Sequence, residues 1–125
     1  MTDTIADLIN RINSINILGK ESFTIPFSKM KVSLLAALKR EGYIYDFSDN
    51  KENGSIEIKL MGSKKTMKKI RRVSKPGRRM YAKSTSIPRP KNGYGVVILS
   101  TPEGVMSGRE AVKAGIGGEI ICEVF

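Results

Sequence analysis

A block of basic residues near the middle of the chain limits how the chain can fold. Residues 64–91 carry twelve Lys or Arg and no Asp or Glu, whereas the other ninety-seven residues carry ten basic and twelve acidic side chains. The formal net charge of +10 is therefore a local +12 on a background of −2. So many like charges must lie at the surface, and they predict a face that meets a polyanion, with nucleic acid as the first candidate.

The alternative interpretation of a basic run is a solvated or disordered segment. This block is internal, however, and contains apolar residues such as Ile70 and Tyr81. Its centre, Lys75-Pro76-Gly77-Arg78, has Pro at the second position of a turn, where φ is already fixed, and Gly at the third, where a positive φ is expected. We therefore predict a basic hairpin that is presented by a folded domain.

The length and composition indicate a soluble globular protein. A chain of 125 residues, 40% of them hydrophobic, can bury one moderate core or two small cores that share an interface. No apolar run is more than a few residues long, far too short to cross a bilayer, and the first four residues lack the pattern of a secretory signal. We expect an intracellular protein with no membrane partner.

The chain has no histidine and a single cysteine, Cys122. An internal disulfide, the usual zinc-ligand sets and Ser-His or Cys-His nucleophile pairs are therefore excluded. No phosphate-binding loop of the G-x-x-x-x-G-K-[ST] type is present. We expect Cys122 to be a small buried hydrophobe, and we expect no enzymatic activity, metal site, cofactor or small-molecule substrate. The alternative is a small enzyme that uses Ser107 or Thr101 with a lysine against a phosphate-bearing substrate.

The first half of the sequence predicts an α-β-α-β-β unit at residues 1–62. Apolar residues at three- and four-residue steps indicate helices, and period-two alternation indicates strands. The expected elements are a helix from Ile5 to near Gly19, a strand over 23–26, a helix over 29–41, and strands over 43–47 and 55–60. Pro26 favours an edge position for the first strand, because proline cannot donate a ladder hydrogen bond.

The second half, residues 63–125, predicts a mostly β unit with one short helix, so that the fold class is α+β. The expected elements are the basic hairpin, a strand over 96–99, a turn over 100–104, a short helix that begins after Ser107 and ends at Gly115, and a strand over 119–125. Ser107 and Glu110 match a capping box. The run Gly115-Ile116-Gly117-Gly118 also has the form of a KH-domain GXXG loop, but no flanking pair of helices is evident.

Four motifs resemble the family of the bacterial small-subunit ribosomal protein numbered eight. They are Val73-Ser74-Lys75-Pro76-Gly77, Gly104-Val105-Met106-Ser107, Ala114-Gly115 and Gly117-Gly118-Glu119-Ile120. The resemblance covers essentially the whole chain and implies two α/β units. It also implies a structural, non-catalytic protein that binds a stem of small-subunit ribosomal RNA in the central domain and supports subunit assembly. Its partners would be that RNA and neighbouring small-subunit proteins, on a cytoplasmic ribosome or, alternatively, an organellar one.

The resemblance carries over ten candidate RNA-binding residues by position. They are Ser100, Thr101, Ser107 and Glu119 in the C-terminal reading site, Ser74, Lys75, Arg79 and Tyr81 in the hairpin, and Lys29 and Lys31 in the N-terminal contact. Three of them also have a purely structural interpretation. Ser107 caps a helix, Glu119 caps a turn, and Tyr81 packs instead of stacking on a base.

The chain departs from the family pattern at three places. Pro102 stands where the family commonly has the third residue of a Ser-Thr-Ser run, so one hydroxyl and one N–H donor are absent. Asn13-Ser14 replaces an Arg-Asn pair, and Gly108 stands where an acidic residue usually begins the helix. We therefore expect a weaker RNA contact in the N-terminal half.

Charge alone is equally compatible with a basic architectural protein that binds DNA or RNA. The resemblance also implies a second possibility, a translational repressor, because some members of that family repress translation of their own messenger RNA. These two functions are the alternatives to a ribosomal role. Against the architectural protein stand the small, patterned C-terminal unit and the motifs quoted above.

Overall fold

The computed structural model describes residues 4–50, 52–60, 67–89 and 95–125. The chain divides into two packing units. We refer to Met1–Met67 as the N-terminal unit and to Lys68–Phe125 as the C-terminal unit. Over the described ranges the structure has three helices and two antiparallel sheets, which confirms the predicted α+β class. The predicted boundary between residues 62 and 63 lies outside the described residues.

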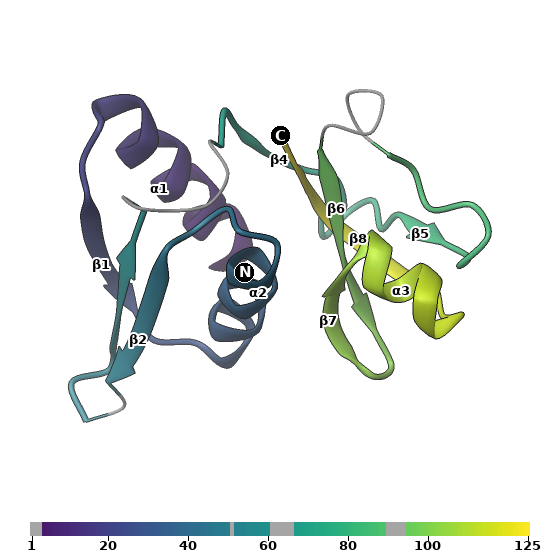
Figure 1. Cartoon of the computed structure of the whole chain (residues 1–125). Coiled ribbons are helices and arrows are strands. Elements are labelled where there is room, and N and C mark those ends of the chain that lie inside the picture. The colour runs from purple at the N-terminus through teal and green to yellow at the C-terminus, as the bar shows by residue number, and fades with distance from the viewer. Residues whose placement is uncertain (1–3, 51, 61–66, 90–94) are drawn as a thin grey trace. The chain divides into compact units, whose positions relative to one another are not determined.

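The N-terminal unit has the predicted α-β-α-β-β order (Figure 1). Its elements are α1 (Thr4–Leu18), β1 (Ser22–Pro26), α2 (Lys29–Arg40), β2 (Asp46–Asn50) and β3 (Ser55–Lys59). The three strands form an antiparallel sheet in the order β1-β3-β2, so β1 is an edge strand and Pro26 lies at its end, as predicted.

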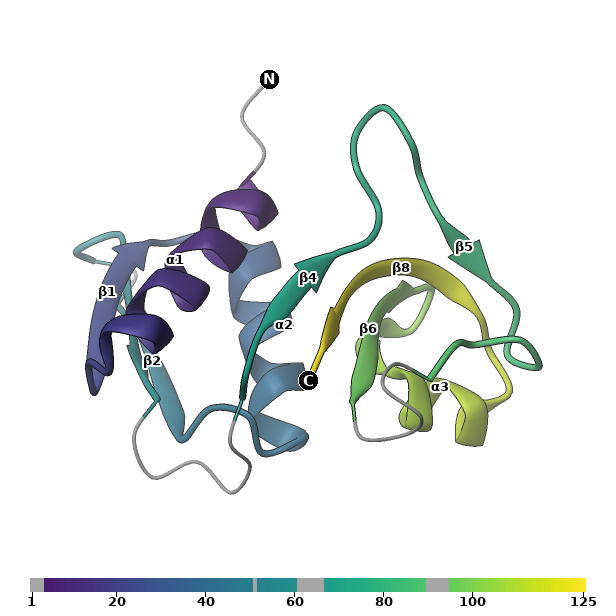
Figure 2. The same cartoon turned by 90° about the horizontal axis from the view of Figure 1, so that it is seen from above.

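The core of this unit lies between the sheet and its two helices, which cover the same face of the sheet (Figure 2). Residues on β1 and β3 alternate between buried and exposed, because successive strand residues point to opposite faces. Each helix contributes one apolar stripe at three- and four-residue spacing. The buried residues of these elements include Ile5, Leu8, Ile9, Ile12 and Ile15 of α1, Leu34, Leu35 and Leu38 of α2, and Phe23, Ile25, Ile56 and Ile58 of the strands.

The predicted strand over residues 43–47 is wrong in its position, since β2 begins only at Asp46. The reason is the way in which α2 ends. Gly42 has a φ of 85°, its N–H donates to the Lys39 carbonyl at 3.0 Å, and the N–H of Tyr43 donates to the Leu38 carbonyl at 3.0 Å. This is a Schellman motif, so Tyr43 still serves the end of the helix and cannot begin a strand.

The C-terminal unit is a five-stranded sheet with one short helix. Its elements are β4 (Ile70–Arg72), β5 (Tyr81–Ala82), β6 (Val96–Thr101), β7 (Gly104–Ser107), α3 (Gly108–Ala114) and β8 (Gly118–Val124). Strand β8 lies in the middle: β6 pairs with one of its edges, and β4 and β5 pair with the other edge one after the other. The sequence pattern missed β7, because four residues between a turn and a helix are too few to show an alternation.

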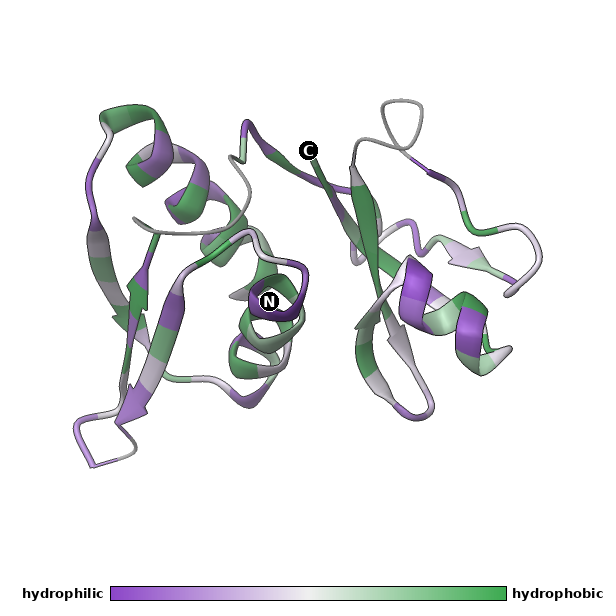
Figure 3. Ribbon diagram, viewed as in Figure 1, coloured by the Kyte–Doolittle hydropathy of each residue, from purple (hydrophilic) through white to green (hydrophobic). Residues whose placement is uncertain are grey.

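The core of the C-terminal unit lies between α3 and one face of this sheet. Val97, Leu99, Ala111 and Ile120 form its buried centre. Strand β6 is hydrophobic along most of its length (Figure 3), as is typical of a strand that is buried on both faces. Helix α3 ends at Gly115, whose φ of 70° agrees with the predicted glycine stop.

Candidate nucleic-acid interface

The chain between β4 and β5 loops outward from β8 (Figure 2). Lys75 and Arg78 exchange both backbone hydrogen bonds, at 3.0 and 2.9 Å, around Pro76 and Gly77, so the predicted tight turn is present. The positive φ predicted for Gly77 is wrong, because this glycine is not among those with a positive φ. The two hydrogen bonds close the turn without it.

The segments that flank this turn do not form the predicted hairpin, because they pair with β8 and not with each other. The N–H of Ser74 donates to the Ile120 carbonyl at 3.0 Å, and the N–H of Ile120 donates to the Met80 carbonyl at 2.8 Å. The chain thus leaves the edge of β8 after Ser74 and returns to it at Met80. We call residues 75–79, which are all exposed, the basic loop.

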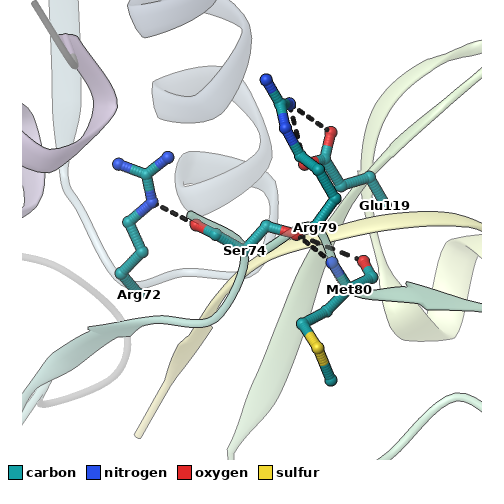
Figure 4. A network of polar contacts seen from close by, with 5 residues as sticks. All are labelled: Arg72, Ser74, Arg79, Met80 and Glu119. Atoms are coloured by element: carbon teal, nitrogen blue, oxygen red, sulfur yellow. Dashed lines mark hydrogen bonds and ion pairs between the residues drawn. The ribbon is translucent and has the colours of Figure 1, made fainter. Parts of the chain in front are cut away.

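Ser74 closes the neck of the basic loop (Figure 4). Its hydroxyl accepts from the Met80 N–H at 2.7 Å and donates to the Met80 carbonyl at 3.2 Å, and the side chain is only 3% exposed. Arg72 Nε donates to the Ser74 carbonyl from the other side. The buried hydroxyl therefore holds the loop in place, and its position does not support the direct RNA contact that was expected of it.

Arg79 and Glu119, which were both candidate residues, form an ion pair (Figure 4). Arg79 Nη1 lies 3.0 Å from Glu119 Oε2 and 3.3 Å from Oε1. Glu119 is thus oriented by a guanidinium and does not have the turn-capping role that was the alternative. Because Arg79 shares its charge with Glu119, the exposed side chains of Lys75 and Arg78 carry most of the net charge of the loop. Arg78 lies in the same turn motif but is not among the ten candidate residues that the resemblance carried over.

A row of side chains crosses the sheet beside the basic loop. Tyr81 of β5 is paired with Glu119 of β8, and Glu119 is paired with Ser100 of β6. Residues directly opposite each other in antiparallel strands project to the same face, so these three side chains lie side by side. Tyr81 is 70% exposed, and the alternative in which it packs into the protein is therefore wrong.

Thr101 follows Ser100 at the end of β6, with its side chain on the other face of the sheet, and its hydroxyl stabilises the turn between β6 and β7. Thr101 Oγ1 donates to the Gly104 carbonyl at 2.7 Å and accepts from the Glu103 N–H at 3.2 Å. Pro102 lies inside this turn and has no N–H to offer a ligand. The Thr101 hydroxyl is therefore already engaged in hydrogen bonds within the turn.

Ser107 is fully buried, and it forms both hydrogen bonds of the predicted capping box. Its Oγ accepts from the Glu110 N–H at 3.3 Å, while its own N–H donates to Glu110 Oε1 at 3.1 Å. The structure thus agrees with the capping interpretation, and it offers a ligand no access to this hydroxyl.

We expect Ser107→Ala to lower the free energy of unfolding by about 1 kcal/mol, because one orphan N–H of α3 loses its acceptor. Urea denaturation measures the loss, and RNA binding by the folded fraction should not change. A loss of RNA affinity without a loss of stability would show instead that Ser107 contacts RNA directly.

Lys29 and Lys31 belong to the N-terminal unit, at the beginning of α2. Lys29 is exposed and can meet a phosphate. Lys31 is 6% exposed and its Nζ donates to the Pro26 carbonyl at 3.1 Å, so its ammonium ties α2 to the end of β1. Of the two expected contacts, the geometry favours only Lys29.

Gly117 and Gly118 permit the strands of this surface to approach one another closely. A Cβ on Gly117 would lie 2.2 Å from the Ala82 carbonyl oxygen, and one on Gly118 would lie 2.2 Å from the Ser100 carbonyl oxygen. Both positions therefore require glycine because of neighbouring backbone. Gly117 lies between α3 and β8 and Gly118 begins β8, so a strand and not a second helix follows the glycines, and the helix-flanked clamp of a KH domain is excluded.

The described residues give little support to a reactive cysteine, a metal site or a membrane-spanning helix. Burial raises the pKa of the Cys122 thiol to about 12, so Cys122 is an unreactive core residue, as predicted. Among the residues that the structure describes, no three His, Cys, Asp or Glu side chains gather as metal ligands would. None of the described helices has the length and apolar character needed to cross a membrane.

Comparison with known proteins identifies the family. The sequence profile of the family described as Ribosomal protein S8 matches residues 3–125. The proteins named small ribosomal subunit protein uS8 from Oleidesulfovibrio alaskensis, Marinobacter nauticus and Dechloromonas aromatica are 43%, 45% and 44% identical to this chain. These alignments cover at least 99% of this chain and 98% of each relative. The chain therefore belongs to the ribosomal protein S8 family, a class of structural proteins of the small ribosomal subunit.

Proposed function

We propose that the chain binds a stem of small-subunit ribosomal RNA in the central domain and supports assembly of the small subunit. The observation that carries this proposal is the row of Tyr81, Glu119 and Ser100 beside the basic loop. It combines an exposed aromatic ring, an oriented carboxylate and a hydroxyl with a source of positive charge. The proposed location is the ribosome, and neighbouring small-subunit proteins are the other proposed partners.

The chemistry of this row suits irregular RNA. The base edges of a regular RNA duplex are hidden in a deep groove, so proteins read 2′-hydroxyls across the minor groove or bases that are unpaired. Tyr81 can stack on such a base, and the Ser100 hydroxyl can donate to or accept from a base edge or a ribose. Glu119 can accept a hydrogen bond from a base amino group.

Arg79 makes a carboxylate acceptable on a surface that meets a polyanion. An unpaired Glu119 would repel phosphates, whereas the ion pair with Arg79 offsets its charge and fixes its orientation. The row and the basic loop then have distinct roles. The row supplies specificity, and the exposed cations of the basic loop supply attraction that does not depend on sequence.

We expect replacement of both Lys75 and Arg78 by Gln to weaken binding to a central-domain RNA fragment on the order of fiftyfold near 0.1 M salt. Each lost phosphate contact should also reduce the slope of log affinity against log salt concentration by up to about 0.9, because fewer counterions are released. Fluorescence anisotropy at several salt concentrations measures both quantities.

A matched control removes two charges elsewhere, at the exposed Lys20 and Lys59 of the N-terminal unit. This double Gln variant should keep the slope of the unaltered chain. If the Lys75 and Arg78 variant keeps that slope as well, the basic loop does not meet RNA and the proposed surface is wrong.

A further inference from the structure

A cavity beside α3 lies outside the proposed RNA surface. Its volume is about 410 Å³, and it is formed within the C-terminal unit by α3, the beginning of β6 and the segment that contains Ile87 and Arg89. Val97 and Leu99 of β6 point toward the core under α3. Ser100 points to the opposite face, because side chains alternate along a strand. The cavity and the RNA-reading row are therefore on different faces of the sheet.

The rim of the cavity is cationic. Arg89, Arg109 and Lys113 line it, and no carboxylate does. Arg109 and Lys113 are four residues apart on α3, so their side chains extend from the same face of the helix. In the parts of the chain that the structure describes, no acidic side chain forms an ion pair with Arg89 or Lys113.

The floor of the cavity is apolar. Ile87, Val97 and Val112 contribute to it, and Val112 is 49% exposed although Ala111 beside it is fully buried. Gly108 permits the close packing of α3 on this floor, since a Cβ there would lie 2.9 Å from Val97 Cγ2 and 3.0 Å from Ile87 Cγ2.

We propose that this cavity binds an acidic segment of a neighbouring protein of the small subunit, with one large apolar side chain on the floor and carboxylates against Arg89 and Lys113. The inference rests on the proposed ribosomal function. Charge complementarity selects an acidic partner, and the apolar floor selects a protein over RNA, because a phosphate backbone gains nothing from Ile87 and Val112. Residues 90–94 lie outside the described residues, and their sequence contains Lys91 but no carboxylate.

Photocrosslinking in assembled small subunits tests the proposal. Benzoylphenylalanine is placed at position 112, and the matched control carries it at position 114, which is exposed on α3 but does not line the cavity. After irradiation, nuclease digestion and mass spectrometry identify the partner of the crosslink. We expect position 112 to crosslink to an acidic segment of another ribosomal protein, and position 114 to yield on the order of tenfold less.

A charge variant adds a second readout. Lys113→Glu should reduce the crosslink from position 112 on the order of tenfold, whereas Lys113→Arg should retain it, because like charges repel an acidic partner. A crosslink to RNA alone, a crosslink to residues 90–94 of the same chain, or no crosslink from a chain that is present in the subunit would each overturn the proposal. Absence of the unmodified chain from assembled subunits would overturn the proposed function, and this inference with it.

Discussion

Replacement of Gly118 by Ala is expected to lower the free energy of unfolding by about 3 kcal/mol, at the upper end of the cost of overpacking. The new methyl group would lie 2.2 Å from the Ser100 carbonyl oxygen and 3.1 Å from the Thr101 Cα. Both atoms belong to the backbone of β6, which cannot move without breaking its pairing with β8. Urea or thermal denaturation measures the loss, and RNA binding should fall with it, because the row of Ser100 and Glu119 is displaced.

Gly77→Ala is the matched control for this substitution. Gly77 has no atom within 4 Å of its Cβ position and no positive φ, so alanine fits without strain. We expect this variant to be more stable by about 0.5 kcal/mol, because alanine restricts the unfolded chain more than glycine does. Similar stabilities for the Gly118 and Gly77 variants would contradict the close approach of β6 and β8.

The second large effect concerns the choice of partner. At physiological salt the chain should bind a central-domain fragment of small-subunit ribosomal RNA on the order of a thousandfold more tightly than a DNA duplex of equal length. The reason is that Tyr81, Ser100 and Glu119 can read unpaired bases and 2′-hydroxyls, which a regular DNA duplex does not offer. Competition between the two ligands in an anisotropy assay measures the ratio.

A basic architectural protein would give a different result in the same assay. Phosphate attraction alone acts on both nucleic acids, so that rival predicts similar affinities and an equally steep salt dependence for both. A ratio near one would therefore favour the architectural protein. In that case the basic loop would still bind nucleic acid, but Tyr81, Ser100 and Glu119 would not determine which nucleic acid is preferred.

The sequence was a reliable guide where the responsible interactions are local. The helix stripes, the capping box of Ser107 and Glu110 and the glycine stop at Gly115 depend on residues within one or two turns of each other. The tight turn at Pro76 and Gly77 is equally local. Only the φ of Gly77 was predicted wrongly, because the two backbone hydrogen bonds between Lys75 and Arg78 close the turn without a positive φ. Family membership, which the motifs indicated, was confirmed over residues 3–125.

Local patterns were insufficient where one element ends and another begins. Alternation over residues 43–47 suggested a strand, but the end of α2 takes up Tyr43 through a hydrogen bond to Leu38. Likewise, the basic segment looked like a hairpin, but β8 offers a longer edge, so β4 and β5 pair with it one after the other. In both cases the neighbouring element, α2 or β8, decided which backbone groups pair.

By itself, the sequence determined the fold class, the positive charge at the surface and the family, because these depend on composition, periodicity and motifs. Only the tertiary structure decided which contacts the candidate residues make within the protein and which of them are exposed. It paired Arg79 with Glu119, exposed Tyr81, and buried the hydroxyls of Ser74 and Ser107 in hydrogen bonds within the protein. The physical reason is that a hydroxyl or a charge can serve the fold or a ligand equally well, and which it serves depends on atoms that the pairing of β5, β8 and β6 brings together.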